Sequence, residues 1–264
     1  MNKSVYSKYF SCAMRSRGIY LTSTVFSVVS SALAVLIQLF LWKALAAAGV
    51  KNNISFDDMA AYVAINAIML ALTNSNLANE IGASIRDGSV VNVFTRPASF
   101  ELAQLFTMLG GNMHRLLATA IPAITLTSVF ARFPLPSSAV NGLVFLPLAI
   151  TGIIITFLLI YLTGLYAFWL QKTWYLSFYL RAGFALFGGT TVPIWFYPDM
   201  LERVSRVLPF RYITFEAINC YLGKTPLSTS IEALLYGLIW VAALQGLVCL
   251  VWRGVNRKVC YNGG

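Results

Sequence analysis

Charged residues are scarce in this sequence. They make up 11% of its 264 residues, whereas about 25% is usual in soluble domains. There is one histidine, His114, and the four cysteines show no spacing typical of a metal site or a disulfide framework. These shortages exclude a soluble domain large enough for nucleic-acid work. They also exclude most metal sites built on histidine.

Hydrophobic residues are abundant instead, at 58% of the chain, with a mean hydropathy of +0.73. A transmembrane helix needs about 20 apolar residues, and six such runs can be placed. We therefore predict an all-α membrane protein, a single domain over residues 1–264, with six transmembrane helices. The first run is too long for a cleavable signal peptide. The predicted spans are 20–42, 59–79, 102–130, 140–169, 175–195 and 231–252.

The distribution of Lys and Arg predicts the orientation. With six spans, both termini share one side, which carries ten basic and three acidic residues, a net charge of +7. The opposite side carries seven basic and six acidic residues, a net charge of +1. Since cytoplasmic loops carry the excess of basic residues, both termini are predicted to be cytoplasmic. The total charge of +10 then reflects topology rather than a nucleic-acid surface.

Ahead of the first span, residues 4–17 place apolar side chains at helical spacing, with Lys8 and Arg15 on the other side. A cationic, aromatic helix of this kind lies in the membrane interface with its apolar face in lipid. We predict such an interfacial helix over residues 1–18. The alternative is a helical extension of the first span.

Polar residues inside the spans are candidates for a translocation pathway. Asn66, Thr73, Asn76 and Glu80 repeat at roughly helical spacing along one face of the second span. Such groups must face protein or water, so they either line a pathway or form hydrogen bonds between helices, and we favour the second. Arg115 in the third span either reaches lipid headgroups or lines the pathway. The pathway candidates are Asn66, Thr73, Asn76 and Arg115.

A charged loop, residues 80–99, follows the second span. Its first part predicts a short helix that ends at Gly88, and Ser89 can cap a second short turn. Pro97 disfavours helical geometry at Arg96. Two short helices with a sharp joint would present Arg86, Asp87 and Arg96 as a docking surface. The alternative is a charged loop that only orients the protein.

After the fifth span, three prolines interrupt a largely apolar stretch, residues 188–222. Irregular backbone at membrane depth is tolerated only where protein or a water-filled cavity shields it. This stretch is therefore predicted to be a re-entrant hairpin near the outer side, with a plain outer loop as the alternative. Trp195, Phe196, Tyr197 and Phe210 would belong to an aromatic belt.

Several familiar functional motifs are incomplete or absent in this sequence. Gly223, Lys224 and Thr225 resemble the end of a P-loop, but Ile218 stands where the first glycine is required, so no ATP site is predicted. No pair of carboxylates lies within the predicted spans, which argues against the hypothesis of an ion-coupled carrier. A membrane protease would need more histidine than His114.

Two segments resemble permease subunits of ABC-2 type transporters, in particular bacterial ABC-2 family transporter proteins with six spans. The first is IRDGSVVNVFTRPAS, residues 85–99, similar to that family's loop after the second span. The second is VPIWFYPDMLERVSRVLPFRY, residues 192–212, similar to its segment after the fifth span. Their order and spacing agree with the predicted topology.

The resemblance implies a membrane subunit, not itself an enzyme, that works with two copies of a separate ATP-binding subunit. ATP and Mg would bind that partner, with no cofactor on this chain. A second permease, identical or similar, and membrane lipid are the other expected partners, with no nucleic acid. Carried over by position, the ATPase-coupling residues are Arg86, Asp87, Gly88, Arg96 and Pro97, and the outer-gate residues are Pro193, Trp195, Phe196, Pro198, Pro209 and Phe210.

The expected activity is ATP-driven export of an amphipathic or hydrophobic cargo, such as a peptide, drug or lipid, across the bacterial cell (inner) membrane. Two alternatives come from other classes: a non-transporting membrane scaffold or immunity protein, and an ion-coupled carrier.

Overall fold

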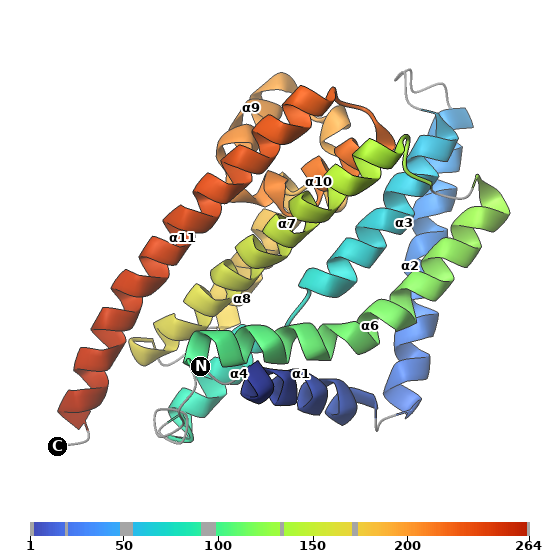
Figure 1. The fold of residues 1–264 in the computed structure, drawn as a ribbon. Coiled ribbons are helices and arrows are strands. Elements are labelled where there is room, and N and C mark those ends of the chain that lie inside the picture. The colour runs from blue at the N-terminus through green and yellow to red at the C-terminus, as the bar shows by residue number, and fades with distance from the viewer. Residues whose placement is uncertain are drawn as a thin grey trace.

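The computed structural model describes residues 3–18, 21–47, 55–90, 99–132, 135–170 and 174–262. Within these ranges the regular structure is helical and contains no strand, which confirms the all-α class. The start of α1 and the end of α11 lie at one end of the molecule, and α9 lies at the other (Figure 1). The helices are α1 (Lys3–Gly18), α2 (Leu21–Ala47), α3 (Phe56–Thr73), α4 (Leu77–Arg86), α6 (Phe100–Phe130), α7 (Ala139–Leu165), η1 (Tyr166–Phe168), α8 (Trp174–Phe187), η2 (Ile194–Phe196), α9 (Asp199–Val207), η3 (Pro209–Tyr212), α10 (Phe215–Leu222) and α11 (Leu227–Asn262).

Five segments of the described chain are long and apolar enough to cross a membrane, where the sequence predicted six. The predicted fifth span is shorter than expected, because α8 ends at Phe187. Its 14 residues extend about 21 Å, less than the roughly 30 Å of a hydrocarbon core. Gly189 follows with a φ of +70°, a left-handed conformation that ends helices. The five segments are Thr24–Ala47, Phe56–Arg86, Phe100–Phe130, Ala139–Phe168 and Leu227–Val255.

The second span is broken. Helix α3 ends at Thr73, and Asn74 adopts an extended conformation (φ −72°, ψ 117°) before α4 begins at Leu77. Thr, Asn and Ser side chains compete for backbone hydrogen bonds and so weaken a helix interior. The prediction of one polar stripe along a continuous helix was therefore wrong, since Asn76 lies in the break and Glu80 lies on α4.

Helix α1 is separate from α2 and lies along the first part of α6, across the direction of α2 and α3 (Figure 1). An extension of the first span is therefore excluded. Part of the apolar face of α1 packs on α6, while Met14 on the same helix stays exposed. Tyr6 is buried, stacks on Phe106 with ring centroids 5.6 Å apart, and its hydroxyl oxygen accepts a hydrogen bond from the Ser99 amide.

The core is centred on α7, which contacts α4, α10 and α11. Large side chains of α7, among them Ile155, Phe157, Tyr161 and Leu165, are at most 2% exposed. Close packing here fixes α4, because a Cβ at Gly164 would lie 2.9 Å from the Ile81 side chain. The short helix after the break is thus held against a rigid centre.

Candidate functional site

The predicted coupling surface begins at the exposed end of α4. Arg86 and Asp87 are both exposed, and Gly88 ends the helix with a φ of +75°, as the sequence predicted. Hydrogen bonds from Ser89, together with the nearby Arg86 charge, hold the pKa of Asp87 below its usual value. Two opposite charges are therefore presented side by side at neutral pH. Arg96 and Pro97, with the second predicted turn, lie outside the described residues.

The other end of α4 adjoins the break, where backbone carbonyls of α3 lack helical partners. The last four carbonyls of any helix are in this position. Side chains from α6 supply donors: Asn112 Nδ2 donates to the Leu72 carbonyl at 2.6 Å, and Arg115 donates to the Asn74 carbonyl. A cation is also favourable at the negative end of the α3 dipole. In this structure Arg115 therefore caps α3.

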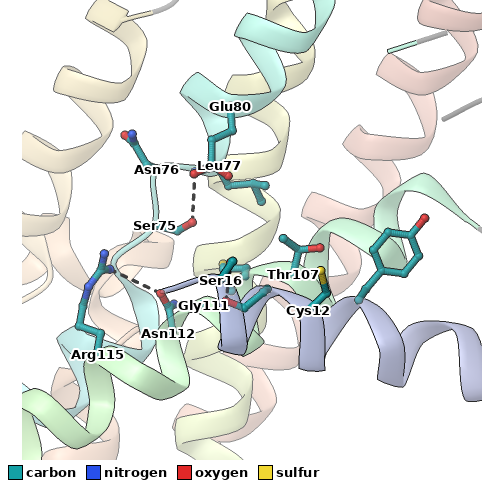
Figure 2. A pocket seen from close by; sticks show the side chains of 13 residues that line it. Cys12, Ser16, Ser75, Asn76, Leu77, Glu80, Thr107, Gly111, Asn112 and Arg115 are labelled. Atoms are coloured by element: carbon teal, nitrogen blue, oxygen red, sulfur yellow. Dashed lines mark hydrogen bonds between the residues drawn. The ribbon is translucent and has the colours of Figure 1, made fainter. Parts of the chain in front are cut away.

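A cavity of about 350 Å³ lies between α1, the break and α6. Figure 2 shows Ser75 and Asn76 of the break on one side and Asn112 and Arg115 of α6 on another, with α1 alongside. Polar side chains dominate its walls. It is lined by Tyr9, Cys12, Ala13, Ser16, Ser75, Asn76, Leu77, Glu80, Thr107, Met108, Gly111, Asn112 and Arg115.

Two further cavities share residues of the break. One of about 210 Å³ is lined by Thr73, Asn74 and Asn76 together with residues of α7 and α8. Another of about 390 Å³ is lined by Asn66, Asn74 and Arg115 together with residues of α2. The structure thus places all four pathway candidates in the walls of cavities around one break.

Two of these candidates also make hydrogen bonds within the protein. Asn66 Nδ2 donates to the Thr190 carbonyl at 2.8 Å, and Thr73 Oγ1 donates to the Met69 carbonyl at 3.0 Å. Tyr62 donates to the Gly189 carbonyl at 2.6 Å, so α3 holds the turn that follows α8. The contact of Asn66 favours the prediction that its side chain forms a hydrogen bond within the protein rather than lining a pathway.

The predicted outer-gate residues are in a folded segment, since the chain after α8 forms η2, α9, η3 and α10 rather than a plain loop. Trp195 packs on Tyr62 and Phe215, with ring centroids 5.2 and 5.7 Å apart, and Phe196 stacks on Trp42 at 5.0 Å. Pro193 and Pro198 flank η2, Pro209 begins η3, and Phe210 contacts Phe184 and Phe187.

The sequence did not predict the role of Asn112 or the ion pair between Arg211 and Glu216. Asn112 gave only a weak signal, an amide three residues before Arg115 in an apolar helix. The ion pair between Arg211 and Glu216, whose side chains are 12% and 7% exposed, gave none, because a spacing of five does not place residues on one helical face. No group of three or more potential metal ligands occurs in the part of the chain that the structure describes.

Residues 32–262 match the family described as ABC-2 family transporter protein. The chain therefore belongs to this family of membrane transport proteins, which confirms the resemblance found in the two segments. Neither the comparison with curated proteins nor the comparison with solved structures gave a match.

Replacing Gly110 by alanine is expected to loosen α1. A Cβ at this position would overlap the Phe10 carbonyl oxygen, and overpacking of this kind costs about 1–3 kcal/mol. We expect faster proteolysis within α1 and a lower midpoint of thermal unfolding. Gly246→Ala is the matched control, since nothing lies within 4 Å of its added Cβ. Equal behaviour of the two variants would show that α1 is not held at Gly110.

Replacing Asn112 by leucine is expected to destabilise the break. The Leu72 carbonyl would lose its donor, and an unsatisfied buried polar group costs about 1–3 kcal/mol. Equilibrium unfolding in mixed micelles measures this loss. Asn79→Leu is the control, because Asn79 donates to the exposed Asn76 side chain and its loss should be small. A larger effect of Asn79→Leu would contradict the capping role of Asn112.

Proposed function

We propose that this chain is the permease subunit of an ATP-driven exporter that moves an amphipathic or hydrophobic cargo outward. Two copies of a separate ATP-binding subunit would supply ATP and Mg, with no cofactor on this chain. One observation carries the proposal: a short helix, α4, ends in the exposed pair Arg86 and Asp87 and begins at the polar break of the second span. A force applied at one end of α4 therefore reaches the other.

The mechanism follows from these contacts. The ATP-binding subunits would bind the loop after α4, including Arg96 and Pro97, and the side of α1. Their closure on ATP would move α4 relative to α3, because the break between them lacks continuous helical hydrogen bonds. Asn112 and Arg115 would transmit that movement to α6. The cavities around the break would then change shape as the pathway turns outward.

The outer segment would act as the gate. Pro193, Trp195, Phe196, Pro198, Pro209 and Phe210 belong to the packed elements η2 to η3, and Asn66 links α3 to the turn that begins them. Movement of α3 would therefore reach the gate directly. Residues 188–222 would form the re-entrant hairpin between a fifth span, beginning with α8, and a sixth, α11.

A second permease, identical or similar, would complete the pathway. None of the 14 residues of α8 is buried within this chain, and Trp174, Phe178 and Tyr179 are each more than 60% exposed. An apolar helix so uncovered needs lipid or another subunit. We place the chain in the bacterial inner membrane, with cytoplasmic termini on the side of α1 and α4, as a single domain over residues 1–264.

The test is co-purification. The chain is expressed with its genomic neighbours and purified in mild detergent by a tag on this subunit, and mass spectrometry identifies the bound proteins. A stoichiometric ATP-binding protein would support the exporter, and a second permease in the complex would define a heterodimer. Recovery of the chain alone, with the neighbours expressed, would favour the scaffold or immunity alternative.

A further inference from the structure

A cavity of about 1100 Å³ lies away from the break, between the outer segment and α11. One wall consists of α9, η3 and α10, and the other is a single face of α11 that includes Glu232, Tyr236 and Trp240. Neither the coupling nor the gating role accounts for its charged lining.

Most charges around this cavity neutralise one another. Arg206 pairs with Glu202 at 2.7 Å, and Arg211 pairs with Glu216. Lys224 pairs with Asp58, which stands outside the lining, at 2.5 Å. Glu232 on α11 is left with no ion-pair partner among the described residues. The lining has equal numbers of basic and acidic residues, but Asp58 takes up Lys224 from outside, so the exposed Glu232 is the acid of the lining that is left without a basic partner in the described part of the chain.

A buried hydrogen-bond acceptor adds to this bias. Asn219 is 2% exposed, and its Oδ1 has no hydrogen-bond partner among the described residues, although burial makes such an atom costly. Arg211 Nη1 is a buried donor that also makes no hydrogen bond to a described residue, with Glu202 Oε1 at 3.8 Å. The site thus offers an acceptor and a carboxylate to an N–H donor, and one donor to a neutral oxygen.

Aromatic side chains complete the cavity. Tyr212 and Tyr236 face each other from η3 and α11, with ring centroids 6.4 Å apart. Trp195 and Phe215 lie on the side of the outer segment, and Trp240 lies on α11. Aromatic faces bind both apolar groups and cations.

We propose that this outer cavity binds an amphipathic organic amine. The ammonium group is held by Glu232 and the side-chain oxygen Oδ1 of Asn219, and the apolar body is held by Tyr236 and Trp240. Arg211 Nη1 donates to a neutral oxygen of the ligand. The site does not depend on the ATP-binding subunit, so it stands apart from the exporter proposal.

The test uses the full chain in phosphatidylcholine nanodiscs, without nucleotide, and monodansylcadaverine as probe. This amine carries a primary ammonium, sulfonyl oxygens and a fluorescent aromatic body. We expect saturable binding by fluorescence, with Glu232→Gln weakening affinity about tenfold or more, since hydrogen bonds to charged groups are strong. Tyr236→Leu should also weaken it. Asp199→Asn, the same change of charge at an exposed acid outside the cavity, should leave it unchanged.

Three results would overturn the proposal. One is equal affinity for the N-acetylated probe, which has no ammonium group. Another is equal loss in the Glu232 and Asp199 variants, which would indicate only surface charge. The third is no saturable binding by a folded wild-type protein. Because co-purification of an ATP-binding subunit is measured separately, failure of either test leaves the other standing.

Discussion

Exchanging the two charges at the end of α4, by Arg86→Glu together with Asp87→Lys, is expected to abolish stimulation of the ATP-binding subunit. Both side chains are exposed, so the fold should tolerate the exchange. Like charges brought together across an interface cost several kcal/mol, which predicts about tenfold or more weaker binding. ATP hydrolysis by the reconstituted complex, and recovery of the partner on the tagged permease, measure the two effects.

The exchange preserves net charge, so the distribution of basic residues that orients the chain is unaltered. Asp87→Asn separates charge from local structure, because it keeps an oxygen that can accept from the Ser89 amide, at 2.9 Å in the wild type. Exchange of Arg132 and Asp57, an exposed pair 3.6 Å apart near the beginning of α3, is the matched control. Normal hydrolysis and binding in the α4 variant would rule out docking at this site.

Replacing Glu216 by leucine is expected to be the most destabilising single change near the outer cavity. Arg211 would keep its charge in a site where its side chain is 12% exposed, with the Glu202 carboxylate 3.8 Å away as its remaining acid. Breaking one side of a buried ion pair costs about 3–5 kcal/mol. Equilibrium unfolding in mixed micelles should show a loss near the lower end of this range, because Glu202 compensates in part.

The double variant Arg211→Met with Glu216→Leu tests the cause. Removing both charges should recover a large part of the loss, because apolar residues of similar size often replace buried pairs without penalty. Arg206→Gln is the control, since its side chain is 64% exposed and exposed pairs contribute about 0–1 kcal/mol. A double variant as unstable as the single one would show that packing, rather than charge, is lost.

Much of the fold could be predicted from the sequence because it depends on local composition. The apolar runs predicted all five segments of the described chain that are long enough to cross a membrane, and Gly88 predicted the end of α4. The amphipathic pattern predicted α1 as a helix, but not that Tyr6 would pack on α6. Hydrophobicity alone does not distinguish a face that meets lipid from one that meets protein.

The break in the second span was missed for a related reason. Thr73 and Asn76 have the right spacing for one helical face, so the pattern predicts a continuous helix. An interrupted backbone in apolar surroundings needs hydrogen-bond donors for its free carbonyls, and here Asn112 and Arg115, about 40 residues away, provide them. The early end of α8 depends in the same way on α3, whose Tyr62 and Asn66 hold the turn after it.

Composition and two sequence segments about 100 residues apart are enough to assign the class of this protein, an all-helical membrane protein of the ABC-2 transporter family. The positions of its polar groups depend on how the helices pack. Asn112 and Arg115 cap a broken helix, and Arg211 pairs with Glu216 beside an outer cavity. Composition and local pattern fix which segments are apolar helices, but a buried polar group must find its partner wherever the chain brings one, and that is a property of the packed fold.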